Sequence, residues 1–447
     1  MKLRGADIVA RALARAGTRY VFTLSGNHVM AVFDAALDAK LTLVHVRHEA
    51  AAVHMADAWG RLTGEAGIAL VTGGPGHANA VSALYTALAA ESPVVLLSGH
   101  APLDELGKGA FQEMGQAEMA APVAKASWTV RSAQVLGDDL ARAIRMAKAG
   151  RPGPVHLSLP SDVLEAKVDV ELPATELFSP APFVSQAVAG ADVVVLAGKR
   201  RDFTLRFGAA FGSGCRVIDA EPGIGRWLEL ASQRRWAASA WLDEVHAAIA
   251  FRPPQWAGLA SNPGGPLHPV EVGRAVQRLL DAPEAVLVAD GGEFGQWSQA
   301  TLCAPHRVIN GPAGAIGAAL PFAAAAKLAL PESNVVAMLG DGTFGFHPSE
   351  FDTAVRCGLA YVAVVGNDRC WNAEHQIQLR SYGAARAHGL DLLPTRYDRV
   401  AAGFGAHGEQ VERPAELAPA LERAARAGRA ACVNVAIERL PAPVFRR

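Results

Sequence analysis

Short apolar runs alternate with helix-length segments in two separate parts of the chain. The first part contains the runs YVFTL, LTLVHV, GIALVT, PVVLLSG and PVHLSLP. The last part contains AVLVADGG, VVAMLGDG, YVAVVGND and ACVNVAI. Apolar strands without polar alternation are typical of parallel sheets that are covered by helices on both faces. The pattern therefore predicts an α/β protein with two doubly wound parallel-sheet domains.

Two Pro-rich stretches, LPATELFSPAPF and RPPQWAGLASNPGGPLHP, separate these parts from a shorter region between them. We place the first domain at residues 1–165, a shortened middle domain at 183–251 and the last domain at 266–447. The middle region contains the apolar runs ADVVVLAG and CRVIDAEPG, so a small α/β domain is expected there. In doubly wound sheets, ligands bind beyond the carboxyl ends of the strands.

Composition excludes several classes of partner. The 447 residues include 42 basic and 43 acidic side chains, so we expect neither nucleic acid nor an acidic membrane as a partner. The five cysteines are scattered and form no CxxC pair, which favours free thiols in a reducing compartment.

No segment is predicted to enter a membrane. The start, MKLRGADIVARALARAG, has the spacing of an amphipathic helix and lacks the pattern of a signal peptide. The long apolar stretch GAIGAALPFAAAAKLALP is interrupted by Pro321 and Lys327 and is better suited to a buried helix, since a span needs roughly 20 strongly apolar residues. We expect a cytoplasmic protein.

Acidic residues follow two of the predicted strands in the last domain. Asp341 lies in a Gly-Asp-Gly turn after VVAML, and Asp368 follows YVAVV. Both carboxylates can therefore project from the same edge of a sheet, where Mg²⁺ would take oxygen ligands together with phosphate and water. Gly340 and Gly342 would let backbone N–H groups approach a phosphate. The alternative for Asp341 is a tight turn with an aspartate N-cap.

A nicotinamide-dependent enzyme is a further alternative for the Gly-rich turns. That class requires GxGxxG at the start of a βαβ unit and an acidic residue about 20 positions later. No such unit occurs in the sequence.

The Gly-Asp-Gly turn followed by Asn367-Asp368 resembles the cofactor motif of the acetolactate synthase-like thiamin diphosphate enzymes, nearest the benzaldehyde lyase and 2-hydroxyacyl-CoA lyase branch. The resemblance implies thiamin diphosphate and Mg²⁺, with Asp341, Asp368 and the carbonyl of Cys370 as metal ligands. The family usually has Asn where Asp368 stands. We expect metal dependence to be retained with an altered pH profile.

The first domain carries a second part of the resemblance, in the pattern HEAA…GRLTG…GPGxxN. Glu49 matches the glutamate that hydrogen-bonds the aminopyrimidine ring and activates the cofactor, a role that needs a buried carboxyl with a raised pKa. Pro75 and Asn79 belong to the same pyrimidine-binding domain and are expected to bind the cofactor. The alternative for Glu49 is an acidic residue at a helix N-terminus.

Further cofactor contacts follow from the same resemblance. In NGPAGAIGAALP, the carbonyl of Gly314 and the N–H of Ile316 would meet the pyrimidine, and the Ile316 side chain would hold the cofactor bent. The alternative for Ile316 is an ordinary core position.

The loop DGGEFGQW resembles the first diphosphate-contacting loop and implicates Gly292, Glu293 and Phe294. A carboxylate beside a diphosphate is unusual, so the Glu293 side chain is expected to point to substrate or to a neighbouring helix.

The segment after the metal motif, CWNAEHQIQL, is expected to form a helix over the site. Thr343 and Trp371 are expected to contact the cofactor. Asn372 and His375 are placed by position beside the substrate.

Substrate-facing candidates come from the first domain. TLSGNHVM carries Asn27 and His28 in a loop after a strand, and FQEMGQ carries Gln112. Gly-x-His loops similar to the first occur in benzaldehyde lyase and the 2-hydroxyacyl-CoA lyase-like branch. Gln112 matches a glutamine that faces the thiazolium in acetolactate synthases and lyases. A neutral imidazole can both give and take a proton near pH 7, so His28 is predicted to be catalytic. The resemblance implies that Asn27 and Gln112 are catalytic too. The alternative for His28 is a surface or capping histidine.

Two departures from the family pattern bear on the ligands. The middle region is about half the usual size, which argues against FAD and puts an acyl-CoA substrate in doubt. The residues after CVNVAI are few, so a long C-terminal lid is not expected.

The resemblance implies a lyase or carboligase that makes or cleaves C–C bonds of 2-hydroxy ketones or 2-hydroxy acids through a cofactor carbanion or enamine. The substrate would be an aldehyde or keto acid, or an acyl-CoA. Alternatives are an acetolactate synthase or a 2-keto acid decarboxylase, and a non-catalytic thiamin diphosphate-binding protein or partner subunit. In this family the two cofactor domains of different subunits face each other, so a homodimer or homotetramer with sites between subunits is expected.

Overall fold

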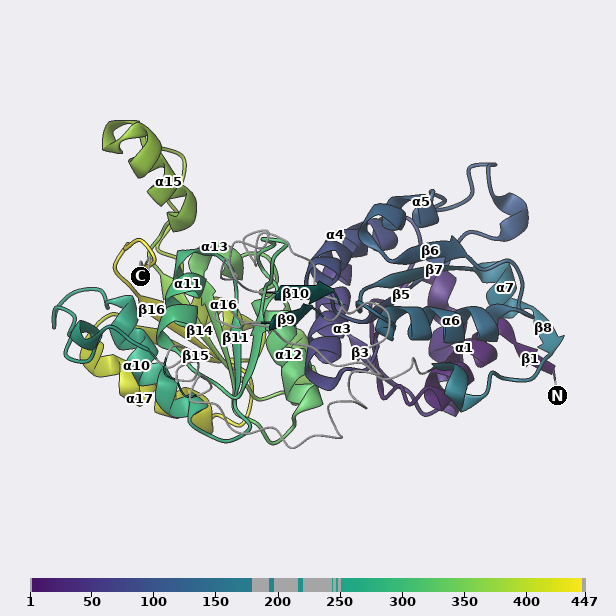
Figure 1. The fold of residues 1–447 in the computed structure, drawn as a ribbon, viewed down its shortest axis with the longest axis horizontal. Helices are drawn as coiled ribbons and strands as arrows, with labels where there is room; N and C mark the ends of the chain where they lie inside the picture. Colours follow the sequence, from purple (N-terminus) through teal and green to yellow (C-terminus); the bar gives the residue numbers. More distant parts are fainter. Residues whose placement is uncertain are drawn as a thin grey trace.

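A computed structural model describes residues 2–178, 193–196, 216–219, Asp243, Ala247 and 251–443. Two lobes make up most of the described chain (Figure 1). Each lobe contains a six-stranded sheet in which every neighbouring pair is parallel. The prediction of two α/β domains with parallel sheets is confirmed.

The first lobe has the strand order β3-β2-β4-β5-β7-β6. Its central strands are buried at every position, as their unbroken apolar sequences predict. The strands are β2 (Tyr20–Thr23), β3 (Thr42–His45), β4 (Gly67–Val71), β5 (Val94–His100), β6 (Ala126–Thr129) and β7 (Val155–Pro160). The edge strand β6 is not among the predicted runs, because ASWT contains too few apolar residues.

Helices cover both faces of this sheet. One face packs against α1 (Gly5–Arg15), α2 (Met30–Asp38), α6 (Leu136–Lys148) and α7 (Ser161–Glu165), and the other against α3 (Glu49–Thr63), α4 (Pro75–Ala89) and α5 (Gln116–Ala120). The predicted N-terminal helix is shorter than expected, because β1 (Lys2–Arg4) pairs antiparallel with β8 (Lys167–Asp169).

The second lobe has the strand order β12-β11-β13-β14-β16-β15. The strands are β11 (Val286–Ala289), β12 (His306–Ile309), β13 (Val335–Gly340), β14 (Val362–Asn367), β15 (His407–Val411) and β16 (Ala431–Ala436). One face packs against α10 (Pro269–Leu280), α11 (Gly292–Thr301) and α17 (Pro414–Arg426), and the other against α12 (Ala319–Ala329), α14 (Glu350–Arg356) and α16 (Tyr397–Gly403). The single turn α13 (Asp341–Phe344) follows β13 directly.

The lobes are joined by α3 of the first lobe and α12 of the second, which lie against each other between the two sheets (Figure 1). The alanines at positions 323–326 of α12 are fully buried, and one apolar cluster extends through both helices. Arg61 on α3 donates from Nε to Asp57 at 2.7 Å and from Nη1 to the carbonyl of Ile309, and its guanidinium lies 5.0 Å from the ring centroid of Phe322. The contact between the lobes therefore combines buried apolar packing with interactions of the charged Arg61 guanidinium.

Most of the predicted middle domain, residues 183–251, lies outside the described residues. The described part contains β9 (Val193–Leu196) and β10 (Arg216–Asp219), which pair in parallel. In the described ranges as a whole, no helix is long and apolar enough to cross a membrane.

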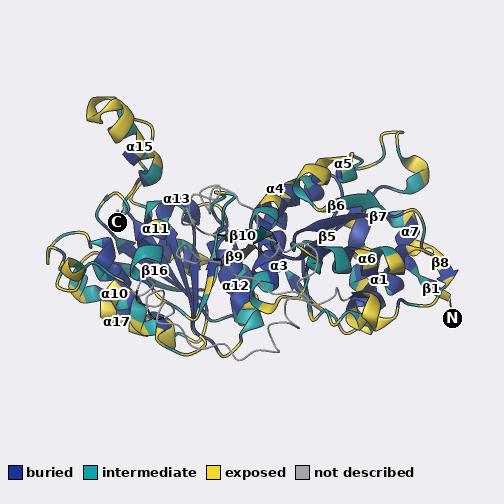
Figure 2. Ribbon diagram, viewed as in Figure 1, coloured by how far each residue is buried: buried dark blue, intermediate teal, exposed yellow. Residues whose placement is uncertain are grey.

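The helix predicted after the metal motif forms as α15 (Asn372–Tyr382). It extends outward from the second lobe (Figure 1), and much of its surface is exposed (Figure 2). Ile377 and Tyr382 are 50% and 65% exposed. The expectation that this helix covers the site therefore holds only for its first turn.

Three histidines meet where the lobes join. The ring of His347 lies 5.6 Å from that of His48 and 5.7 Å from that of His54, measured between centroids. Burial lowers the pKa of His54 and of His347, and Nδ1 of His54 has no hydrogen-bond partner among the described residues. Burial thus holds the imidazoles of His54 and His347 in their neutral form.

Acid should weaken this junction. A folded-state pKa below the ordinary value of 6.5 means that the unfolded chain takes up the proton first as the pH falls, so stability is lost below about pH 6.5. His54→Leu should remove up to about 1.4 kcal/mol of that loss for each pH unit below 6.5. Urea titrations at pH 7.5 and 5.5 measure the difference. The exposed His388→Leu is the matched control, and equal pH dependence in the two variants would contradict the assignment.

Candidate cofactor site

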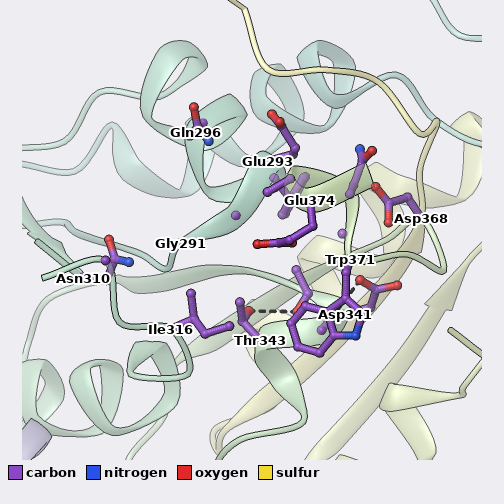
Figure 3. Close-up of a pocket in the computed structure, with 18 of the residues that line it drawn as sticks. Gly291, Glu293, Gln296, Asn310, Ile316, Asp341, Thr343, Asp368, Trp371 and Glu374 are labelled. Atoms are coloured by element: carbon purple, nitrogen blue, oxygen red, sulfur yellow. Dashed lines mark hydrogen bonds between the residues drawn. The ribbon is translucent and has the colours of Figure 1, made fainter. Parts of the chain in front are cut away.

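A cavity of about 710 Å³ opens at the carboxyl ends of β11, β13 and β14 (Figure 3). All the described residues that line it belong to the second lobe. They include every predicted cofactor and metal residue of that lobe: Gly292, Glu293, Phe294, Gly314, Ile316, Gly340, Asp341, Gly342, Thr343, Asp368, Cys370 and Trp371. His375 does not line the cavity, whereas Asn372 does.

Asp341 is positioned by the end of β13. Its side chain is 3% exposed and accepts hydrogen bonds from the backbone N–H groups of Gly342 at 2.8 Å and Arg369 at 2.7 Å. Burial raises its pKa to about 6, although the backbone donors oppose the shift. The Arg369 contact ties the turn after β13 to the turn after β14.

Asp368 lies at the end of β14, the neighbouring strand, so the two carboxylates meet at one edge of the sheet (Figure 3). Burial, together with the nearby Asp341 carboxylate, raises the pKa of Asp368 to about 7, whereas Arg439 and Asn372 act in the opposite direction. Two acidic groups this close favour a cation between them.

The Gly-Asp-Gly turn leaves space at its backbone. A Cβ at Gly340 would meet no atom within 4 Å, whereas one at Gly342 would lie 2.7 Å from the ring of Trp371. The Thr343 hydroxyl donates to the carbonyl of Gly340 at 3.0 Å. Gly342 is therefore required for the close approach of the indole, which forms part of the cavity wall.

The loop that carries Ile316 is held by a residue that the sequence reasoning missed. Asp290, 1% exposed, accepts hydrogen bonds from the N–H groups of Gly317 at 3.0 Å and Ala319 at 3.1 Å. Burial raises its pKa to about 6. Asn310 fixes the same loop by donating from Nδ2 to the carbonyl of Ala315 at 2.6 Å. Asp290 directly follows β11 and could have been recognised as another acidic residue at a strand end.

Glu293 lies in the first turn of helix α11, beside the cavity. Its carboxylate accepts a hydrogen bond from the N–H of Ala442 at 2.6 Å, and burial raises its pKa. The side chain thus contacts the segment after β16. The ring of Phe294 packs on Gly366, where a Cβ would lie 2.4 Å from the ring.

Glu49 lies in the other lobe and does not line the cavity. It begins α3, is 9% exposed, and accepts a hydrogen bond from Nδ2 of Asn79 at 3.0 Å. Pro75 is the first residue of α4, on which Asn79 also lies. These three predicted residues form one group at the carboxyl edge of the first sheet.

The predicted substrate residues of the first lobe lie at the same edge. Nδ1 of His28 is 3.2 Å from the hydroxyl of Thr72, and burial lowers the pKa of His28. Gln112 adopts a left-handed backbone (φ 56°) in contact with Gly74, whereas Asn27 is exposed. The His28 ring stacks on Phe111 at 6.1 Å.

A buried amide that the sequence reasoning missed fixes this edge. Oε1 of Gln116 accepts from the N–H of Gly74 at 2.9 Å, and Nε2 donates to the carbonyl of Gly99 at 3.1 Å. No signal in the sequence marks it, since a single glutamine within GQAEMA has no distinguishing pattern.

Each lobe matches a known domain. Residues 3–119 match the thiamine pyrophosphate enzyme N-terminal TPP binding domain, and residues 290–435 match the C-terminal TPP binding domain. The chain is 31% identical to the acetolactate synthase large subunit IlvG of Mycobacterium tuberculosis, with 96% of this chain and 94% of that protein covered.

Two further relatives are named for two different reactions. The chain is 27% identical to human 2-hydroxyacyl-CoA lyase 2, with 97% of this chain and 90% of that protein covered. It is 28% identical to the catabolic acetolactate synthase of Raoultella terrigena, with coverages of 94% and 92%. This chain therefore belongs to the thiamine pyrophosphate enzyme family, among the homologues of acetolactate synthase and 2-hydroxyacyl-CoA lyase 2.

Asp290→Asn should loosen the loop that carries Ile316, because an amide would set an NH₂ group against backbone donors. We expect a loss of about 1–3 kcal/mol of stability and weaker binding of thiamin diphosphate with Mg²⁺. Thermal unfolding and tryptophan fluorescence measure the two effects. Asp281→Asn, at an exposed position on the surface, should change neither. Unchanged loading and stability in Asp290→Asn would contradict this role.

Proposed function

We propose that this chain is a thiamin diphosphate- and Mg²⁺-dependent lyase or carboligase that makes or cleaves C–C bonds of 2-hydroxy ketones or 2-hydroxy acids. The observation that carries the proposal is that residues suited to bind thiamin diphosphate lie at the carboxyl edges of both sheets. One edge holds paired carboxylates beside a glycine turn, and the other holds a buried glutamate.

The oxygen donors of the second lobe fit Mg²⁺ bound to a diphosphate. Mg²⁺ takes six oxygen ligands and usually keeps phosphate and water among them. Among the described residues no group of three or more His, Cys, Asp or Glu side chains could hold a metal. Asp341, Asp368 and the carbonyl of Cys370 would bind the metal together with oxygens of the diphosphate. The open backbone at Gly340 and the wall formed by Ile316 and Trp371 suit the rest of the cofactor.

Thiamin diphosphate, when bound, supplies the carbon nucleophile and accepts the electrons of the broken C–C bond. Glu49 would share a proton with a ring nitrogen of the pyrimidine, and Asn79 holds its carboxylate in place. Ile316 would fix the bent shape of the cofactor. His28 would give or take the proton of a substrate hydroxyl, because burial keeps its imidazole neutral at pH 7.

Since Glu49 lies outside the cavity of its own chain, we propose that two copies complete each site. The first lobe of one copy would face the second lobe of the other, in a homodimer or homotetramer. The exposed apolar residues of α15 would lie in such an assembly.

Products should identify the reaction. Protein loaded with Mg²⁺ and thiamin diphosphate is incubated separately with pyruvate, benzoin, and formyl-CoA plus an aldehyde, and products are identified by mass spectrometry. Cleaved benzoin, a new 2-hydroxy ketone or a hydroxyacyl-CoA is the expected result. Acetolactate or acetaldehyde from pyruvate alone would instead favour the synthase or the decarboxylase, and the names of two relatives support the synthase. Tight binding without any product would favour the non-catalytic alternative.

Glu49→Gln should retain cofactor binding and lose at least about 100-fold in turnover, because proton transfer by a positioned side chain contributes about that much or more. The affinity comes from single-site titration and the rate from the best substrate of the product assay. Glu165→Gln, at an exposed position, serves as control. Turnover within a factor of two of the wild type would show that Glu49 does not activate the cofactor.

A further inference from the structure

The turn after β14 carries two of the three proposed metal ligands, and its central residue has an unfavourable backbone. Arg369, between Asp368 and Cys370, has φ 60°. For an L-residue other than glycine, the left-handed conformation costs about 1–2 kcal/mol, so something must hold it.

Three hydrogen bonds on Arg369 hold the turn in this conformation. Its N–H donates to Asp341 at 2.7 Å, and its carbonyl accepts from the N–H of Leu392 at 2.8 Å and from Nη2 of Arg439 at 3.0 Å. Arg439 also donates to the carbonyl of Asp368, from Nη2 at 3.2 Å. One guanidinium thus bridges two successive carbonyls of the turn.

Arg439 is held in place through the backbone of its neighbour Glu438 and through its own side chain. It follows β16, where the N–H of Glu438 donates to the carbonyl of Leu267 at 2.9 Å. Its Nη1 forms an ion pair with Asp391 at 2.9 Å, and its side chain is 33% exposed. An exposed ion pair of this kind adds little stability on its own. The main contact of Arg439 is therefore the pair of hydrogen bonds that its planar guanidinium donates to the carbonyls of Asp368 and Arg369.

The neighbouring residues of the same segment also contact the cavity wall. The carbonyl of Leu440 accepts from Nδ2 of Asn372 at 3.1 Å, and the N–H of Ala442 donates to Glu293. Asn372 begins α15 and Glu293 lies in the first turn of α11. Residues 438–442 therefore connect three separate parts of the cavity: the metal turn, α15 and α11.

We propose that Arg439 is a positioning residue that holds the left-handed turn at Arg369 and so sets Asp368 and the Cys370 carbonyl for the metal. This inference rests on the proposed Mg²⁺–thiamin diphosphate site and adds to it a residue outside the cavity. Arg439 acts through the backbone carbonyls of Asp368 and Arg369. Within the described part of the chain, none of its hydrogen bonds goes to the Asp368 carboxylate or the Cys370 carbonyl.

The test measures thiamin diphosphate binding at saturating Mg²⁺, by quenching of tryptophan fluorescence. Arg439→Met should raise the Kd about tenfold, because the strain in the turn is then opposed by fewer contacts. Arg439→Lys should give an intermediate Kd, since an ammonium lacks the planar fork. Arg426→Met, on the exposed face of α17, should leave the Kd unchanged.

A second substitution separates positioning from a general structural effect. Glycine adopts the left-handed conformation without strain, so Arg369→Gly in the Arg439→Met background should restore the Kd to within about threefold of the wild type. Arg369→Ala removes the same side chain, keeps the strain and should restore nothing. Equal Kd values for these two double variants, or an unchanged Kd in Arg439→Met, would overturn the inference. A wild-type protein that binds no thiamin diphosphate with Mg²⁺ would instead overturn the proposed function.

Discussion

Buried carboxylates that accept hydrogen bonds from backbone N–H groups shape the cavity edge of the second lobe. Asp290 and Asp341 each follow a strand of the same sheet, and each fixes a loop that is remote in sequence: Asp290 the turn at Gly317, and Asp341 the turn at Arg369. Burial makes the ionised form of such a carboxylate unfavourable in free energy, and the pKa values of both residues are raised accordingly. A bound cation would offset that cost at Asp341, whereas the partners of Asp290 within the described ranges are backbone N–H groups.

The first lobe shows a different design at its corresponding edge. Its polar groups include one glutamate, an imidazole and several amides, and the buried amide of Gln116 ties the Gly74 turn to β5. Such an edge suits a neutral ring with hydrogen-bonding nitrogens better than a phosphate. The two lobes share a parallel-sheet architecture and differ in the chemistry at their strand ends, as the proposed division of the cofactor between them requires. The α3–α12 contact joins the lobes of one chain, yet leaves Glu49 outside the cavity.

The sequence predicted the sheets because strands such as β4 and β14 are apolar at nearly every position and are buried on both faces. It missed β6, β12 and β15, whose short edge sequences are partly polar and carry little signal. The Asp341–Asp368 pair was predictable because parallel strands end at one edge. The roles of Asp290, Gln116 and Arg439 depend on backbone groups that only the folded chain brings near. Of these three residues, only Asp290 could have been recognised from the sequence, because it directly follows a predicted strand. The direction of α15 also lay beyond the sequence, because helical periodicity does not specify which way a helix leaves its domain.

In the proposed assembly, a working site combines Glu49 of one copy with Asp341 of another. Glu49→Gln and Asp341→Ala, each inactive alone, are co-expressed with different affinity tags, and the hybrid is isolated by two successive purifications. One site of the hybrid then has both native residues, so the account predicts about half of the wild-type activity per dimer. A hybrid as inactive as its parents would show that each site is built within one chain and would contradict the account.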